Sequence, residues 1–416
     1  MNTVLRGELV KPAYRAEFGA HWRAVLATAL GLGAGVALSI YLNSLFLPHL
    51  SREFGWTEQQ FALTGVAALG ATIGVLISGR MADRYGVRRV AQVGIIGMPL
   101  VWIAFSQLGG DIRAYYALFT LKMLVGTTTT SVVYARITAE RFMTARGIAL
   151  ALAIGGAPVV GGLSAPVINA VIHEEGWRTG YLAVAALSAV LGAAAWMLLP
   201  RERGPGFAGI TPELLSTRES YRILARAPVL WVIVGAMLLC NLPALMVSLQ
   251  TKPMLMSLGV GAAEVGWLVS VYAAGVLAGR LGCGLALDFF PAHRVAAIAM
   301  GLPAIGLTLL GTQPDALWIV IIAMLLLGLS QGAEGDIAAY LVAGRFTFAL
   351  FGTVKGIITA AIGIAAAFGG VILSTMLGAG IGYTGFLFLS AVSVAIGAVM
   401  FGFLGSERMR RRVGES

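Results

Sequence analysis

Charge is scarce in this sequence: Asp, Glu, Lys and Arg together make up only 12% of its 416 residues. Soluble globular chains carry about a quarter of such residues, and a chain of this length could not cover a soluble surface with so few. Hydrophobic residues account for 58%, and the mean hydropathy is +0.86. Because the apolar runs are long and the polar breaks between them are short, the sequence predicts an integral membrane protein.

Segments of alternating polarity are missing as well. A transmembrane β-barrel would show them at about ten residues each, so we expect helices instead. The 55 glycines agree with helices, since small residues let transmembrane helices pack closely. The expected fold class is an all-α membrane protein.

Cysteine and histidine are rare, which removes several kinds of site. Cys240 and Cys283 lie in apolar segments and the four histidines are scattered, so neither a disulfide framework nor a zinc site is indicated. No G-x-x-x-x-G-K-[ST] motif occurs, and no catalytic cluster emerges. We expect no metal, no cofactor and no enzymatic activity. The first apolar run lacks a small-residue cleavage site, so we interpret it as a retained helix.

Twelve apolar segments come close to or exceed the roughly 20 residues that a helix needs to cross the hydrocarbon core. A polar stretch divides them into two halves of six, which predicts an N-terminal bundle at 1–199, a cytoplasmic linker at 200–227 and a C-terminal bundle at 228–416. The expected spans are 23–47, 58–79, 89–108, 112–134, 146–170, 178–199, 228–250, 264–286, 293–311, 315–340, 350–377 and 382–404.

The 29 Lys and Arg residues are distributed unevenly between the loops. If the N-terminus and every second loop are cytoplasmic, 22 of the 29 lie on that side, four lie on the other side and three lie within spans. This is the bias of the positive-inside rule. We expect a protein of the bacterial cytoplasmic (inner) membrane with both termini in the cytoplasm. The net charge of +10 then reflects topology rather than nucleic-acid binding.

The two halves carry matching short signatures. "GRMADRYGVRR" (79–89) aligns with "GLALDFFPAHR" (284–294) at an offset of 205, and "RFMTARG" (141–147) aligns with "RFTFALFG" (345–352) at nearly the same offset. Many secondary transporters are built from such internal repeats, with the substrate site between two halves that move alternately.

The loop at 79–89 combines glycines, which allow close helix approach and a tight turn, with an acid and several arginines. It resembles the G-x-L-x-D-R-x-G-R-R/K signature of the major facilitator superfamily, with Met81 in place of the leucine. The chain resembles that superfamily over essentially its whole length. The resemblance implies twelve helices in two pseudo-symmetric six-helix bundles and a cytoplasmic gate latch in this loop. The candidate gating residues are Gly79, Asp83, Arg84, Gly86 and Arg88.

Three further stretches resemble the bacterial oxalate/formate antiporter and monocarboxylate transporter group: "FLPHLSREFGW", "RGIALALAIGGAPVVGG" and "AGRLGCG". That group places an arginine in the eighth span, and its oxalate/formate branch adds a lysine in the eleventh. Arg280 and Lys355 match these two positions. Val276 and Tyr41 depart from the acid and the lysine of the eukaryotic monocarboxylate branch, which weakens any transfer of that branch's coupling mechanism to this chain.

Four charged residues in the second half fall at a similar depth within the expected spans: Arg280, Glu334, Asp336 and Lys355. An ionised side chain inside a span costs about 2.5–3.5 kcal/mol on insertion scales, so each needs a partner or an aqueous cavity. Arginine suits bidentate binding of a carboxylate, and lysine acts as a mobile point charge. Arg280 and Lys355 are therefore candidate substrate-binding residues. A structural ion pair, and for Lys355 snorkelling to the interface, remain the alternatives.

The remaining polar residues of the spans have weaker assignments. Glu334 and Asp336 are two residues apart on a helix and point about 200° away from each other. One of them can face the cavity and carry a coupling proton, and the other ties the helix to a neighbour; the sequence leaves open which. Lys122 either supports the core of the first half or contributes to the field around an anion. Tyr41 and Asn241 are candidate cavity-lining residues, although a lone amide is more often a helix–helix hydrogen bond.

Together these features predict a secondary active transporter of small organic anions, with mono- or dicarboxylates as the expected substrates. Alternating access would be driven by proton symport or by exchange with a counter-anion. We expect a monomer in the lipid bilayer. One alternative is a proton-coupled multidrug or metabolite exporter, because "APVVGG" at 157–162 is close to the antiporter motif G-P-x-x-G-G. Another is a membrane scaffold or receptor that does not transport.

Overall fold

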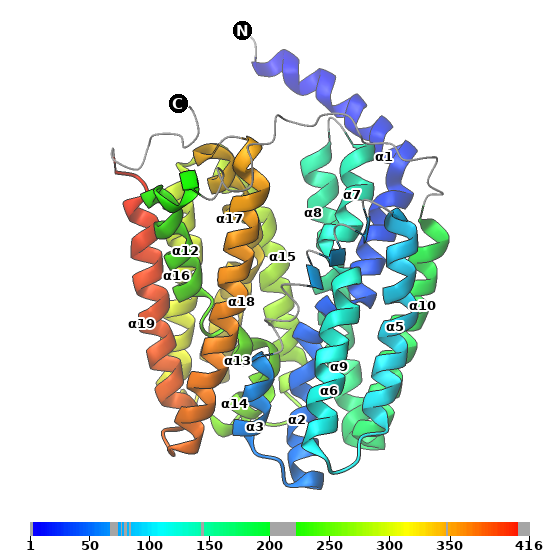
Figure 1. Cartoon of the computed structure of the whole chain (residues 1–416), viewed down its shortest axis with the longest axis vertical. Coiled ribbons are helices and arrows are strands. Elements are labelled where there is room, and N and C mark those ends of the chain that lie inside the picture. The colour runs from blue at the N-terminus through cyan, green and yellow to red at the C-terminus, as the bar shows by residue number, and fades with distance from the viewer. Residues whose placement is uncertain are drawn as a thin grey trace. The chain divides into compact units, whose positions relative to one another are not determined.

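The computed structural model describes residues 3–66, 74–75, 77–78, 81–82, 85–142, 145–199, 222–346 and 348–406. Every element within them is a helix (Figure 1), which confirms the all-α class. The chain divides into two compact units. The first combines Met1–Leu42 with Ile73–Gly204, and the second combines Asn43–Thr72 with Pro205–Ser416. Residues 43–72 are thus grouped with the second unit, although they come early in the chain.

The first unit is a bundle around an apolar and aromatic core. Val90, Ala91, Val133 and Tyr134 are buried together at its centre. Asp111 begins one of the helices by accepting a hydrogen bond from the backbone N of Arg113 at 2.9 Å, as N-cap residues do. The elements are α1 (Thr3–Ala34), η1 (Val36–Leu38), α5 (Val87–Ser106), α6 (Ile112–Gly126), η3 (Thr127–Thr129), α7 (Ser131–Arg141), α8 (Arg146–Ile154), α9 (Gly156–Glu175) and α10 (Trp177–Leu198).

The second unit includes a short insert from the first half of the chain. Helix α2 (Ser39–Phe54) begins in the first unit and continues into the second. Thr57 then forms a capping box with Gln60 and so begins α3 (Glu58–Ala62). The other elements are η2 (Leu63–Val66), α12 (Pro228–Cys240), α13 (Ala244–Leu249), α14 (Thr251–Ser257), α15 (Val265–Phe289), α16 (Ala292–Gly311), α17 (Leu317–Arg345), α18 (Phe348–Gly378) and α19 (Gly382–Phe403).

Within the described residues, eight helical segments are long and apolar enough to cross a membrane, and each matches one of the twelve expected spans. A ninth is obtained if α1 and α2, which are bent by 53° around Gly35, count as one span. The eight segments are Val87–Ser106, Ile148–Glu175, Trp177–Leu198, Val265–Leu287, Ala292–Gly311, Leu317–Val342, Thr353–Gly378 and Gly382–Phe403.

Two of the other expected spans are interrupted helices, and the sequence explains both interruptions. Between α6 and α7, the hydroxyls of Thr127, Thr128, Thr129 and Thr130 each donate to the carbonyl oxygen three residues earlier, at 2.7–2.8 Å. Such side-chain bonds compete with the helical ladder. Between α12 and α13 stands Pro243, which has no N–H to continue the helix. The last expected span, 58–79, extends beyond the described residues.

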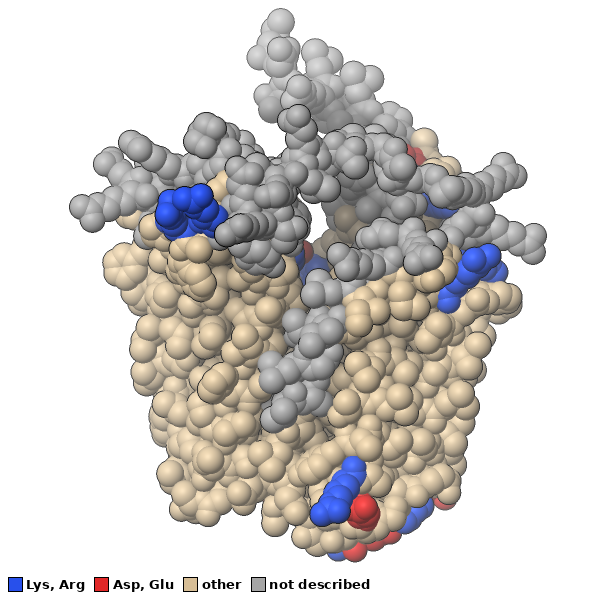
Figure 2. Space-filling model, in the orientation of Figure 1, with Lys and Arg blue, Asp and Glu red and all other residues tan. Residues whose placement is uncertain are grey.

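The outer sides of the helices are apolar. Residues spaced at about one turn are exposed on α5 (Val93, Ile96, Leu100) and on α19 (Val392, Ile396, Val399). On the face drawn in Figure 2, the coloured charged side chains lie mainly near the two ends of the helices, with uncharged surface between them. This distribution fits helices whose sides contact lipid, as expected for an integral membrane protein.

Candidate functional site

Helices α15 and α17 contact each other through glycines. Gly275 and Gly279 on α15, and Gly328 and Gly332 on α17, each follow the G-x-x-x-G spacing. A Cβ added at Gly275 would lie 2.7 Å from the carbonyl oxygen of Leu325, and one at Gly279 or Gly332 would overlap a backbone carbonyl of the other helix. The two backbones are therefore in direct contact, the arrangement that small-xxx-small motifs allow in membranes.

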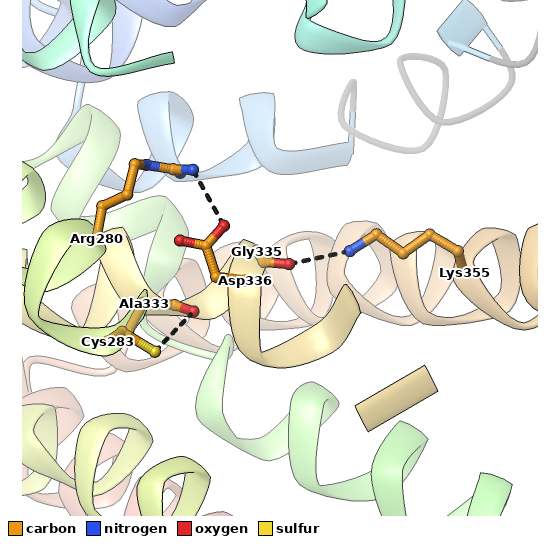
Figure 3. A network of polar contacts seen from close by, with 6 residues as sticks. All are labelled: Arg280, Cys283, Ala333, Gly335, Asp336 and Lys355. Carbon is orange, nitrogen blue, oxygen red and sulfur yellow. Dashed lines mark hydrogen bonds and ion pairs between the residues drawn. The ribbon is translucent and has the colours of Figure 1, made fainter. Parts of the chain in front are cut away.

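This contact brings Arg280 and Asp336 together. Arg280 follows Gly279 directly, and Asp336 lies one turn after Gly332. Nη1 of Arg280 donates to Oδ1 of Asp336 at 3.3 Å (Figure 3). The arginine side chain is 15% exposed and the aspartate side chain 36%. A single contact of this length is weaker than the bidentate pairing that a guanidinium can form with a carboxylate.

Lys355 approaches the same turn of α17 from another helix. Its Nζ donates to the carbonyl oxygen of Gly335 at 3.4 Å, from α18 (Figure 3). Gly335 also lies close to Arg280, since a Cβ added there would be 4.0 Å from Nη2. Two cationic groups from α15 and α18 therefore converge on the consecutive residues 335 and 336. Each makes a contact at the long end of the hydrogen-bond range.

Glu334 occupies a different environment from Asp336. It is 8% exposed and accepts a hydrogen bond from Nε2 of Gln331 at 2.9 Å. It also lines a small recess of the second unit. The recess lies beside the interruption between α12 and α13, and its other lining residues include Asn241, Tyr272, Met300, Pro303 and Ser330. Glu334 and Asp336 thus point to different surroundings, as their spacing predicts.

Asn241 stands at the end of α12, where the helix is interrupted. Its Nδ2 donates to the carbonyl oxygen of Met237 at 3.0 Å, and its side chain is also hydrogen-bonded to Glu334. The amide therefore closes the helix end and contacts the acid of the recess. It lies with Glu334 rather than beside the guanidinium of Arg280.

Lys122 lies far from these residues in sequence and belongs to the first unit. It is 1% exposed on α6, with its Nζ 4.2 Å from the ring centre of Phe119, 5.0 Å from Trp102 and 5.1 Å from Phe105. A cation over aromatic faces is stabilised by the ring quadrupoles. Of the two roles left open for Lys122, these contacts favour support of the core of the first unit.

Tyr41 also belongs to the first unit. It is 4% exposed on α2, and its ring packs against Gly161 on α9, where a Cβ would overlap the ring. The tyrosine therefore fills the space that the glycine leaves. This packing does not test a role in lining a substrate cavity.

Of the candidate gating residues, Gly79, Asp83 and Arg84 lie outside the described residues. Gly86 has a φ of +85° and directly precedes α5, so a residue without Cβ suits the turn there. Arg88 donates from Nη1 to the carbonyl oxygen of Leu199 at 2.6 Å, and its guanidinium lies 4.6 Å from the ring centre of Trp196. Arg88 thus holds the end of α10 within the first unit.

Some features of the site escaped the sequence analysis. Gln331, which donates to Glu334, is one; no pattern in the sequence singles out that amide. The two G-x-x-x-G pairs are another, and here the signal was present, since a sequence search for this spacing finds both. Their consequence, the approach of Arg280 to Asp336, depends on the two helices being neighbours, which the sequence does not state.

Comparison with known proteins places the chain in a family. The family model of the Major Facilitator Superfamily matches residues 29–251, more than half of the chain. The chain therefore belongs to the major facilitator superfamily: it is an integral membrane transporter whose relatives move small molecules and are generally not enzymes. A search of curated proteins returns no match to the sequence.

Solved structures share the same fold. Two crystal structures of a bacterial homologue of the human lysosomal transporter Spinster, both inward-facing, are similar to this chain. The unoccupied form has a TM-score of 0.67 at 17% identity and covers 91% of this chain and 96% of its own. The occupied form has a TM-score of 0.65 at 15% identity, with 92% and 96% covered. The TM-scores show that the fold is shared, and identities this low carry no information about the substrate.

Proposed function

We propose that this protein is a secondary active transporter of small organic anions, with mono- or dicarboxylates as substrates. One observation supports the proposal most directly. Arg280 and Lys355, from two different helices, converge on residues 335 and 336, and their hydrogen bonds there are long, at 3.3 and 3.4 Å. A substrate carboxylate offers both cations shorter, charge-assisted hydrogen bonds. In the proposed cycle the substrate takes the place of Asp336 beside Arg280 and engages Lys355 as well.

The charges around this turn suit the exchange of one anion for another. Arg280 and Lys355 are balanced by Asp336 and Glu334, so the four groups are neutral together when ionised. An anionic substrate adds one or two negative charges, which proton uptake or the departure of a counter-anion would offset. Proton symport and anion exchange are both consistent with this arrangement. The proposed location is the bacterial cytoplasmic membrane, with a monomer whose termini both lie in the cytoplasm.

Thermal stabilisation of the purified protein tests the site. We expect a panel of mono- and dicarboxylates to raise the melting temperature, because a ligand that binds the native state stabilises it. Arg280→Ala and Lys355→Ala should each weaken apparent binding about tenfold or more, the effect of losing a charge-assisted hydrogen bond. Arg294→Ala, an exposed arginine at the start of α16, is the matched control and should bind as the wild type does. Full stabilisation of both site variants by the carboxylates would refute the anion site.

A second candidate function is a proton-coupled exporter of drugs or metabolites. The recess in the second unit favours it, because a buried acid, Glu334, lies there among Tyr272, Met300 and Pro303. An acid with aromatic and apolar neighbours suits a cationic, partly apolar compound. Adding lipophilic cations to the same panel separates the two functions. Stabilisation by the cations alone, lost in Glu334→Gln, would favour the exporter.

A further inference from the structure

The recess beside Glu334 carries a negative charge without a matching cation in its lining. Among the described residues that line it, Glu334 is the one carboxyl, and none is Lys, Arg or His. The hydrogen bonds of Glu334 suit the ionised form: Nε2 of Gln331 donates to it at 2.9 Å, and the side-chain amide of Asn241 is bonded to it as well. Because a buried charge needs a partner, the recess calls for a positively charged occupant.

The end of α12 adds a second source of negative potential. The helix ends at Cys240, and both Cys240 and Asn241 line the recess. The last carbonyl groups of a helix have no N–H partner within it, and the helix dipole places a partial negative charge there. Interrupted helices of transporters hold cations at such C-terminal ends. The carboxylate of Glu334 and the end of α12 thus favour the same kind of ligand.

The polar side chains of the recess supply hard oxygen ligands. Asn241 and Gln331 donate through their amide nitrogens, so each keeps its amide oxygen as an acceptor. The hydroxyl of Ser330 donates to the sulfur of Met300 at 3.8 Å and keeps the lone pairs of its oxygen. With the carboxylate of Glu334, these groups give four oxygen-bearing side chains around one small space. Such oxygens suit hard cations rather than soft metals.

Charge and size select a small monovalent ion. One carboxylate balances one positive charge, so a divalent ion would leave an excess. The described part of the chain contains no group of three or more His, Cys, Asp or Glu that could hold a metal. The cavity volume of the recess is about 40 Å³, room for about three water-sized groups. A sodium ion with one or two waters fits this space, whereas a larger organic cation would require the helices to separate.

Glu334 is joined to the proposed anion site through α17. The next two residues, Gly335 and Asp336, contact Lys355 and Arg280 (Figure 3). Glu334 interacts electrostatically with the same two cations, so its negative charge opposes an incoming anion. A cation bound beside Glu334 would cancel that repulsion. Each ligand would then strengthen the binding of the other, since coupling between two sites is reciprocal.

We propose that this recess is a sodium site, with Glu334, Asn241, Ser330 and Gln331 as its side-chain ligands, and that Na⁺ bound there accompanies the anion through the transport cycle. The coupling rests on the proposed transport function, whereas the binding of Na⁺ does not. The ion supplies the positive charge that an anionic substrate requires, in place of a proton or of an exchanged counter-anion.

The melting temperature of the full-length protein in detergent, without a carboxylate, tests the sodium site. Sodium chloride in place of choline chloride at constant ionic strength should raise it in a saturable way, and potassium chloride should raise it far less. Glu334→Gln should weaken the apparent affinity for Na⁺ about tenfold or more, and Ser330→Ala about threefold or more. Glu174→Gln, at an exposed acid of α9, is the control and should respond as the wild type does.

The comparison uses the rise caused by Na⁺, so it does not depend on how a substitution changes stability by itself. Equal melting temperatures in sodium and potassium chloride would overturn the assignment to Na⁺, whatever the value in choline chloride. A rise retained in full by Glu334→Gln and Ser330→Ala would overturn the location, and Ser330→Ala decides alone if the other variant does not fold. Stabilisation by a lipophilic cation with none by Na⁺ would assign the recess to the second candidate function.

Carboxylate binding in the two salts tests the coupling separately. In the wild type we expect the most stabilising carboxylate of the panel to bind at least about fivefold more tightly in sodium chloride than in choline chloride. In Glu334→Gln the two affinities should be equal. Equal affinities in the wild type would overturn the coupling. If no carboxylate binds in either salt, the proposed anion transport fails, and the sodium site still stands or falls by the melting temperatures alone.

Discussion

Nη1 of Arg88 donates to the carbonyl oxygen of Leu199 at 2.6 Å, where α10 ends. The second unit has the same relationship: Nη2 of Arg345 donates to the carbonyl oxygen of Leu404 at 2.7 Å, where α19 ends. Leu199 and Leu404 are 205 residues apart, the offset between the repeats, but the two arginines come from different positions in their repeats. Each unit therefore closes the last helix of its repeat with an arginine, which comes from the start of α5 in the first unit and from the end of α17 in the second.

Removing either arginine should weaken the unit that contains it. The last carbonyls of a helix have no partner within the helix, and a cation there also interacts favourably with the helix dipole. We expect Arg88→Ala and Arg345→Ala each to lower the free energy of unfolding by about 1–3 kcal/mol. The melting temperature in detergent measures the loss. Arg226→Ala, on the chain before α12, is the control and should melt as the wild type does.

Asp336→Asn should increase the affinity of the proposed site for anions. In the wild type a substrate carboxylate competes with Asp336 for Arg280, and the neutral amide competes far less. We expect binding of a monocarboxylate to become about tenfold tighter, a gain of roughly 1.4 kcal/mol, as measured by calorimetric titration. Unchanged or weaker binding would mean that Asp336 positions the Arg280 side chain and does not compete with the substrate for it.

Alanine at Gly279 or Gly332 should separate α15 from α17. The new methyl group would overlap the carbonyl oxygen of Leu329 in the first variant and that of Val276 in the second. Overpacking of this kind costs about 1–3 kcal/mol or more, and we expect both a lower melting temperature and weaker anion binding. Gly282→Ala is the matched control on α15, because a Cβ there has no atom within 4 Å among the described residues. If Gly279→Ala melts as Gly282→Ala does, the helices are not held at backbone contact.

Lys252 should make stability depend on pH at the alkaline end. It lies on α14 outside the expected spans, and burial lowers its pKa from the usual 10.5 to about 8. Between pH 8 and 10.5 the unfolded chain therefore keeps a proton that the native protein has released, so stability rises with pH across this window. We expect the melting temperature to increase from pH 8 to pH 10 in the wild type and to increase less in Lys252→Met. Parallel curves would show that another group titrates there.

The sequence predicted the parts of this protein that depend on composition and periodicity. Apolar length identified the eight uninterrupted spans, among them α5, α10, α16 and α19, and the 79–89 loop indicated the family that the comparison then established. The interrupted helices were harder to predict, because Thr127–Thr130 and Pro243 act through local hydrogen bonds that hydropathy does not register. The direction of Glu334 and Asp336 was left open, because a helix position alone does not say which neighbours pack on each side.

The location of segment 57–66 shows a different kind of limit. Order along the chain assigned residues 43–72 to the N-terminal bundle at 1–199. The division into bundles at 1–199 and 228–416 stays a prediction. In the structure α3 contacts α13 and α18, and η2 contacts α18. Nothing local in the sequence of α3 indicates this, since its capping box and its apolar residues would serve equally well in either unit.

The glycine contact between α15 and α17 has a consequence for selectivity. Because the two backbones touch, the Cα positions of Arg280 and Asp336 form a fixed frame, and only side-chain length decides how wide the opening between them is. Each added or removed methylene changes that reach by about 1.3 Å, within the standard C–C geometry. Asp336→Glu would therefore change the aperture by one methylene on an unchanged scaffold, whereas Arg280→Lys would also replace the planar guanidinium with an ammonium group. For the proposed anion transport, such a substitution would adjust discrimination between anions of different length without repacking a helix.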